Sequence, residues 1–195
     1  MGKIKHLDKI EALFEKSPVI NFRSIERVTG KGKNSSYAKL LIRNLIKKGK
    51  IIQLKKGWYS KHHEIGLAVF CFKQAYLGLQ SALSYHGLWE QETMPVILTS
   101  ARVRIGVRNV AGKNVYVRRI SKKYCFGFEY NEDGSFYLPY STVEKTLIDM
   151  AVYRLKITKE VLIKTREIIN KSKLKEYLKP YPNKIKKHVM QLLEE

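Results

Sequence analysis

The first 62 residues carry a pattern of short amphipathic helices followed by a hairpin. The hydrophobic spacing predicts elements over residues 4–16, 22–28, 34–48, 51–54 and 58–60. Ser17-Pro18 ends the first helix, because a residue before proline is biased away from helical backbone. Asn21 can cap the second helix, and Gly49 can end the third. Three helices followed by two strands are typical of a winged helix-turn-helix.

The rest of the chain changes from helices to strands and back to helices. Helical spacing covers residues 62–73, 78–86, 141–153, 159–170, 173–179 and 183–193, and strand-like runs cover 96–99, 103–107, 115–120, 124–128 and 135–138. Ser141 followed by Glu144 has the spacing of a capping box. We predict an α+β protein with an N-terminal winged helix-turn-helix over residues 1–62. A mixed α/β domain follows over residues 63–195, with an antiparallel-type sheet and a helical C-terminal tail.

The helix predicted over residues 34–48 has one apolar face and one polar face. The apolar face contains Ala38, Leu41, Ile42, Leu45 and Ile46, and the opposite face contains Ser36, Leu40, Arg43 and Lys47, flanked by Lys39 and Asn44. A recognition helix needs this arrangement, because an apolar back seats it on its domain while polar side chains of different lengths reach base edges.

The charge of the chain favours a polyanionic partner. The formal net charge is +21 and the sequence pI is about 9.9. Residues 1–62 hold 16 Lys and Arg against 4 Asp and Glu, so this third of the chain carries +12 of the excess. A Lys-rich solvated surface, as in thermophilic proteins, is the alternative, but it does not explain this concentration. We therefore expect double-stranded DNA as the partner, with an operator that can contain inverted repeats.

Each residue type on the polar face suits a particular DNA contact. Arg43 can pair with guanine O6 and N7, Asn44 with adenine, and Leu40 can contact a thymine methyl group. Backbone and wing contacts to phosphate are expected from Ser35, Ser36, Lys55 and Lys56. The complete predicted DNA-binding set is Ser35, Ser36, Tyr37, Lys39, Leu40, Arg43, Asn44, Lys47, Lys55 and Lys56.

Two further features have alternative interpretations. Trp58 and Tyr59 either stack on bases or, as is more common in a wing, pack back on the first helix. A second basic cluster alternates with Val, Ile and Tyr on the predicted strands, and its main members are Arg102, Arg104, Arg118 and Arg119. This cluster is either a secondary phosphate-contacting face or an ordinary solvated face of the sheet.

The sequence gives little sign of catalysis, metal binding or membrane insertion. Glu129, Glu132 and Asp133 are the nearest approach to a clustered acidic site, but they lie in a turn pattern, and His86 is better explained by its place after a helix. Cys71 and Cys125 lack ligand-like neighbours, so no zinc site is expected. The charged N-terminus does not resemble a signal peptide. We expect a cytoplasmic protein without catalytic residues, metal or cofactor.

Three passages of the chain resemble a known family. They are Lys55-Lys56-Gly57-Trp58-Tyr59 in the predicted wing, YLGLQSALSYHGL over residues 76–88, and STVEKTLID over residues 141–149. The chain resembles the AbiEi-type antitoxins of type IV toxin–antitoxin systems and the related transcriptional regulators. The resemblance covers most of the chain to about residue 155.

The resemblance implies a non-enzymatic DNA-binding repressor of its own operon. It further implies that the second domain counters a nucleotidyltransferase-like toxin, for which composition and spacing give no sign. Two other functions stay open from the sequence: a nuclease that its winged helix delivers to DNA, and an RNA-binding module that recognises shape and phosphates.

Overall fold

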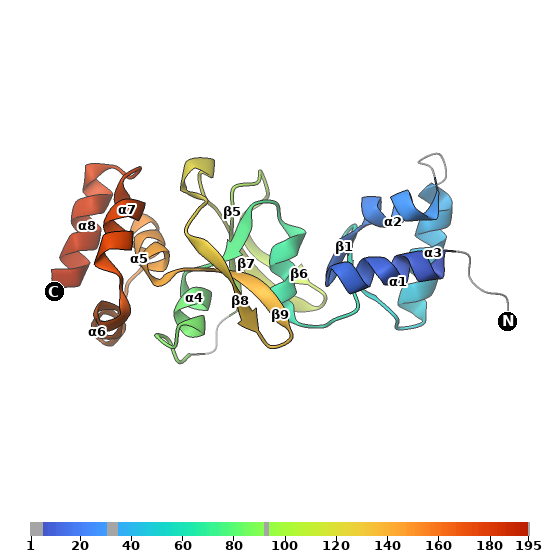
Figure 1. The fold of residues 1–195 in the computed structure, drawn as a ribbon, viewed down its shortest axis with the longest axis horizontal. Coiled ribbons are helices and arrows are strands. Elements are labelled where there is room, and N and C mark those ends of the chain that lie inside the picture. Colours follow the sequence, from blue (N-terminus) through green and yellow to red (C-terminus); the bar gives the residue numbers. More distant parts are fainter. Residues whose placement is uncertain (1–5, 31–34, 92–93, 195) are drawn as a thin grey trace. The chain divides into compact units, whose positions relative to one another are not determined.

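The first unit of the protein is a winged helix-turn-helix (Figure 1). The computed structural model describes residues 6–30, 35–91 and 94–194. The elements of the first unit are α1 (Leu7–Lys16), β1 (Val19–Asn21), α2 (Phe22–Thr29), α3 (Ser35–Lys47), β2 (Ile52–Lys55) and β3 (Trp58–Ser60). The strands form an antiparallel sheet in the order β1-β3-β2. The predicted sequence of three helices and a hairpin is confirmed, and β1 adds a third strand.

Local sequence explains the turns of this unit. The backbone N–H of Ser24 donates to Asn21 Oδ1 at 2.9 Å, so Asn21 caps α2 as predicted. In the hairpin, Lys55 lies opposite Trp58, which leaves Lys56 and Gly57 as a two-residue turn. Gly57 has φ of 80°, a conformation that glycine adopts without the steric cost of a side chain.

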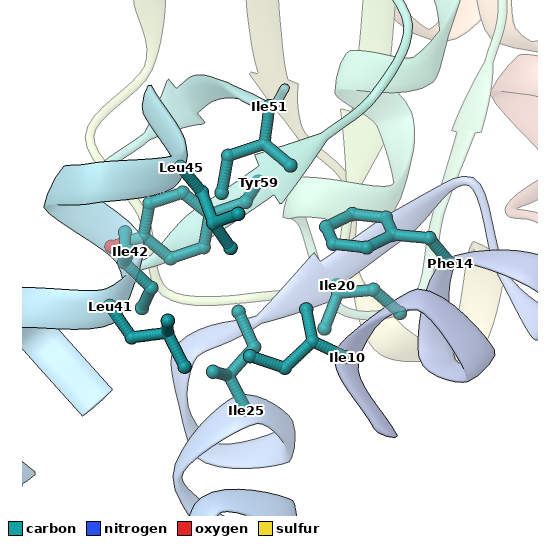
Figure 2. Close-up of a cluster of buried hydrophobic side chains, with 9 residues drawn as sticks. All are labelled: Ile10, Phe14, Ile20, Ile25, Leu41, Ile42, Leu45, Ile51 and Tyr59. Atoms are coloured by element: carbon teal, nitrogen blue, oxygen red, sulfur yellow. The ribbon is translucent and has the colours of Figure 1, made fainter. Parts of the chain in front are cut away.

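A single apolar core holds the three helices and the sheet together. Figure 2 shows nine buried side chains that converge from α1, β1, α2, α3, β3 and the residue before β2: Ile10, Phe14, Ile20, Ile25, Leu41, Ile42, Leu45, Ile51 and Tyr59. Tyr59 is therefore a core residue, in agreement with the packing interpretation of the wing aromatics. Burial raises the pKa of its phenol above the ordinary value. Ile46, which we expected on the buried face, is 37% exposed.

The segment after the hairpin belongs to the first unit. Residues 62–73 were expected to form an α-helix, but the structure has a 3₁₀ helix there, η1 (Ile65–Cys71). This helix packs against β1 and β2. The boundary between the two compact units accordingly lies at residues 71–72, which differs from the expected 62–63, and Asn109–Lys113 also belong to the first unit.

The second unit is built on a six-stranded mixed sheet. The strands of this sheet are β4 (Ala75–Leu77), β5 (Val96–Thr99), β6 (Gly106–Val110), β7 (Lys113–Arg119), β8 (Phe128–Asp133) and β9 (Phe136–Ser141), in the spatial order β6-β7-β5-β4-β9-β8. Asn109–Lys113, which the first unit includes, are the residues at the turn between β6 and β7. The pairs β5–β7 and β4–β9 are parallel, whereas β4–β5 and β8–β9 are antiparallel. The α+β class is confirmed, but the sheet is mixed where an antiparallel type was expected.

The strands differ from the sequence pattern in several places: no strand was expected at β4, β9 continues past the expected residue 138 to Ser141, and two expected strands begin later than the pattern indicates. The run 124–128 was expected to be a strand, but the chain instead forms a 3₁₀ turn, η2 (Lys122–Tyr124), and β8 begins only at Phe128. The strand expected over 103–107 begins at Gly106. In both places the loop before the strand contains residues that are common in strands: Val103 and Ile105 before β6, and Tyr124 and Phe126 before β8. The composition typical of a strand therefore extends beyond the hydrogen-bonded segment.

Helices of the second unit include α4 and a C-terminal group, as the helical spacing predicts. They are α4 (Gln80–Tyr85), α5 (Val143–Val152), α6 (Lys159–Ile168), α7 (Lys171–Leu178) and α8 (Asn183–Glu194). Helix α5 packs against β9 on one side and against α7 and α8 on another. It is therefore the helix that joins the sheet to the C-terminal tail.

The start of α5 differs from the capping box that we expected. Thr142, not Ser141, is the N-cap, and its side chain accepts a hydrogen bond from the backbone N–H of Lys145 at 3.4 Å. The Ser141 hydroxyl instead lies 2.7 Å from the Thr146 hydroxyl. Glu144 accepts a hydrogen bond from the backbone N–H of Asn170 at 2.9 Å, so its carboxylate holds the start of α7.

An ion pair lies fully buried inside the second unit. Lys145 and Asp149, one turn apart on α5, are both 0% exposed, and the Lys145 ammonium contacts Asp149 Oδ1. The Tyr76 hydroxyl of β4 donates to Asp149 Oδ2 at 2.7 Å, and the Lys145 ammonium lies 5.5 Å from the centre of the Tyr76 ring. Burial raises the pKa of Asp149 and lowers that of Lys145, and their mutual attraction opposes both shifts. This network ties α5 to the sheet.

Substitutions of the adjacent residues Leu40 and Leu41 test which face of α3 packs against the core. Leu41 is 3% exposed and lies in the core, whereas Leu40 is 55% exposed. We expect Leu41→Ala to lower the free energy of unfolding by about 2–5 kcal/mol, because it leaves a cavity. Leu40→Ala is expected to change it by less than about 0.5 kcal/mol. Urea unfolding followed by circular dichroism measures both; equal losses would contradict the assigned faces.

The buried pair is expected to be costly to break and inexpensive to remove as a whole. Lys145→Met leaves Asp149 buried without its cation, so we expect a loss of about 3–5 kcal/mol. The triple variant Lys145→Met, Asp149→Leu, Tyr76→Phe removes every polar member and is expected to recover most of that loss.

The exposed pair of α6 provides the control for this measurement. Lys164 lies 3.9 Å from Glu160 at the same i,i+4 spacing and 3.2 Å from Glu90. Because both carboxylates are largely exposed, Lys164→Met is expected to cost less than about 1 kcal/mol. Equal losses of unfolding free energy in urea for Lys145→Met and Lys164→Met would show that burial does not determine the cost of breaking the Lys145–Asp149 pair.

Candidate nucleic-acid interface

The exposed face of α3 carries nearly all of the residues predicted to bind DNA. The exposed side chains of this set on the helix are Ser36, Tyr37, Lys39, Leu40, Arg43, Asn44 and Lys47. The side chain of Ser35 lies outside the described part of the structure. Because the buried residues Ala38, Leu41, Ile42 and Leu45 share the opposite face, the core fixes which side chains of the helix are available to a partner.

Three cations form a column along this exposed face. Lys39, Arg43 and Lys47 follow one another at i,i+4 spacing, and α3 contains no Asp or Glu. Among the described residues, no carboxylate forms an ion pair with any of the three. Like charges one turn apart repel each other and weaken an isolated helix. A polyanion on this face would relieve that repulsion, whereas a neutral partner would not.

Apolar groups stand among these cations. Leu40 is 55% exposed, and Tyr37 is 36% exposed, with its ring in an edge contact with His6 at a centroid distance of 6.2 Å. A single exposed leucine is common on protein surfaces. Its place between Lys39 and Arg43 gives the face both charged tips and an apolar one, which suits the mixed chemistry of base edges.

The wing is short, and its two lysines differ. Lys56 is exposed at the turn, while Lys55 is half-buried and its ammonium donates to the Cys71 carbonyl at 3.2 Å. To contact a phosphate as expected, the Lys55 ammonium would have to leave the Cys71 carbonyl. The backbone N–H of Phe22 donates to the Gly57 carbonyl at 2.8 Å, which holds the turn to the start of α2. Lys56 is the wing cation that faces solvent.

The four arginines of the expected secondary basic face do not share one face. Arg102, Arg104 and Arg119 are exposed, whereas Arg118 is half-buried. Arg118 and Arg119 are successive residues of β7, and successive side chains of a strand point to opposite faces. The guanidinium of Arg118 lies over the rings of Tyr116 and Tyr153. Arg118 therefore belongs to a different environment from Arg119.

The acidic residues considered for catalysis have structural contacts. Glu129 pairs with Lys173 at 2.8 Å, and Asp133 accepts a hydrogen bond from the Tyr140 hydroxyl at 2.7 Å. His86 Nε2 lies 2.8 Å from the Ser141 carbonyl, so its ring connects the end of α4 to β9. Across residues 6–30, 35–91 and 94–194, no group of three or more His, Cys, Asp or Glu side chains is arranged to hold a metal ion.

The comparisons with known proteins concern the fold. No protein-family model matches the chain, and no curated protein matches its sequence. Among solved structures, it is similar to the RV2827C protein from Mycobacterium tuberculosis, with a TM-score of 0.60 and 14% sequence identity. The similarity covers 96% of this chain and 75% of that one. This likeness supports the α+β architecture across both units. Within the described residues, no helix is long and apolar enough to cross a membrane.

Sequence reasoning missed two arrangements in the second unit. The buried Lys145–Asp149 pair had a visible sign, since two opposite charges lie one turn apart in the largely apolar segment Val143–Val152. Tyr76, which completes that network, is 69 positions away from Lys145 in the chain, and no local pattern links the two. The contact of the Arg118 guanidinium with the Tyr153 ring is likewise long-range, whereas Tyr116 is only two positions before Arg118 on β7.

Proposed function

We propose that the protein is a sequence-specific regulator that binds double-stranded DNA through α3 and the wing. One observation carries this proposal: the exposed face of a helix seated in a winged helix-turn-helix holds the column Lys39, Arg43 and Lys47, with which no carboxylate of the described residues forms an ion pair. An α-helix fits the major groove of B-DNA, and the winged helix-turn-helix presents such a helix at its surface. The basic excess of the first 62 residues supports the same partner.

The residues of this surface divide into two roles. Arg43 and Asn44, near the middle of α3, read base edges, and Leu40 contacts a thymine methyl group. Ser36, Lys39, Lys47 and Lys56 contact phosphates and set the position of the helix. Loss of a base-reading residue is expected to change the sequence preference, whereas loss of a phosphate-contacting residue is expected to lower the affinity for every duplex.

The resemblance to AbiEi-type antitoxins supports a more specific role. On that basis we propose that the protein acts in the cytoplasm as the antitoxin of a type IV system, represses its own operon and counters a nucleotidyltransferase-like toxin without enzymatic activity. The test is co-expression with the neighbouring reading frame. Growth arrest by that frame alone and rescue by this protein would support the antitoxin role, and a neighbour without toxicity would contradict it.

Salt dependence tests whether phosphates dominate the binding. A helix and wing that together neutralise about six phosphates are expected to give a slope of log affinity against log salt of about −5. Fluorescence anisotropy with a labelled random duplex measures this slope between low and physiological salt. Binding that does not change with salt, or no binding at low salt, would contradict the proposal.

Two substitutions separate base reading from phosphate contact. Arg43→Ala is expected to cost about 1–3 kcal/mol on a duplex selected from a random library, and much less on random duplex, because it removes a base contact. Lys56→Ala is expected to weaken both duplexes alike and to reduce the salt slope by about 1. Anisotropy titrations of both variants on both duplexes measure these differences.

The second unit supplies the control for these variants. Lys159 lies on α6, and Lys159→Ala is expected to bind both duplexes like the wild type. If Arg43→Ala and Lys56→Ala also bind like the wild type, the assigned face is wrong. Competition with a structured RNA completes the design, since RNA that displaces the selected duplex at equal concentration would favour the RNA-binding alternative.

A further inference from the structure

The second unit contains a cavity that the DNA-binding proposal does not use. Its volume is about 480 Å³, within the range of roughly 300–1,000 Å³ that is usual for small-molecule sites. The apolar part of its wall comes from Leu79, Trp89, Val96, Tyr116 and Leu155. Arg118 is the one charged side chain among its described lining residues. An apolar cavity with a single cation is suited to an apolar molecule that carries one negative charge.

The guanidinium of Arg118 is held in place before any ligand arrives. It lies 5.3 Å from the centre of the Tyr116 ring and 4.7 Å from the centre of the Tyr153 ring. The Tyr153 hydroxyl donates to the Arg119 carbonyl at 2.9 Å, which fixes the second ring. No carboxylate of the described residues forms an ion pair with Arg118. Its planar set of donors is therefore oriented and available to a carboxylate.

Two further observations distinguish this cavity from an incidental surface hollow. Trp89 Nε1 is a buried donor with no hydrogen-bond partner among the described residues. Leu79, a non-glycine residue, has φ of 54° and ψ of −128°, a conformation that L-residues rarely adopt. Strained backbone often marks binding sites, because the surrounding structure must hold it in place. The unpaired Trp89 donor shows in addition that ordinary packing does not satisfy every polar group beside this cavity.

We propose that this cavity binds a small aromatic monocarboxylate. The aromatic part would lie against the rings of Trp89 and Tyr116, where offset or edge-on ring contacts are favourable. The carboxylate would accept hydrogen bonds from Arg118. One guanidinium balances one negative charge, which disfavours dianionic phosphate esters in this apolar surrounding. The site does not depend on DNA binding, since all of its described lining residues belong to the second unit.

Trp89 allows binding to be followed directly. The chain has two tryptophans, and Trp58 lies in the first unit, so Trp58→Phe leaves Trp89 as the one tryptophan reporter. The probes are benzoate, phenylacetate, 3-phenylpropionate and 1-naphthoate, each paired with its neutral amide. We expect at least one acid to change Trp89 fluorescence saturably and to bind at least tenfold more tightly than its amide. The same acid should raise the melting temperature of the unmodified full chain.

Two variants test whether the Arg118 guanidinium binds the carboxylate. Arg118→Gln is expected to weaken the acid at least tenfold and to abolish the preference for acid over amide. Arg119→Gln, the neighbouring position on the opposite face of β7, is expected to bind like the parent protein. The proposal is overturned if none of the four acids gives a saturable change, if amides bind as well as acids, or if Arg118→Gln keeps the preference. If Arg118→Gln does not fold, the acid-versus-amide difference in melting temperature decides.

Discussion

The burial of one face of α3 is the constraint on which the proposed DNA-binding surface depends. Ala38, Leu41, Ile42 and Leu45 pack into the core of the first unit, and the helical period then leaves the opposite face in solvent. The cations of α3 could not be turned inward without exposing these apolar side chains. The core thus orients the helix as well as stabilising the unit, and the surface chemistry follows from the packing (Figure 2).

A different constraint organises the second unit. The segment STVEKTLID carries part of the family resemblance, and in the structure its charged residues make buried contacts within the fold. Lys145 and Asp149 connect α5 to Tyr76 of β4, while Glu144 holds the backbone at Asn170. A buried ion pair adds little net stability but requires specific partners, so it suits a role in fixing how α5 meets the sheet. The charged residues through which this segment resembles the family thus have a structural role in this chain.

The sequence predicted the elements better than their connections. The helical spacing of the first three helices, the Asn21 cap and a turn that joins the two wing strands depend on neighbouring residues, and the structure contains all three. The parallel pairs of the sheet were missed because parallel partners are distant in the chain. For the same reason, no local pattern revealed that Lys55 contacts the Cys71 carbonyl or that Arg118 stacks on Tyr153. At the candidate site, the helical period alone predicted which face of α3 is exposed. The position of the Lys55 side chain in the wing depends on a tertiary contact, so the sequence did not predict it.

The most direct test of this account is an NMR titration of the uniformly ¹⁵N-labelled full chain with a duplex selected from a random library. If α3 and the wing bind DNA, the largest amide shift changes are expected in residues 36–47 of α3 and at Lys56 and Gly57. A random duplex is then expected to give smaller changes at Arg43 and Asn44 than the selected one. Changes concentrated in the second unit, or identical changes with both duplexes, would contradict the claim that α3 reads DNA sequence.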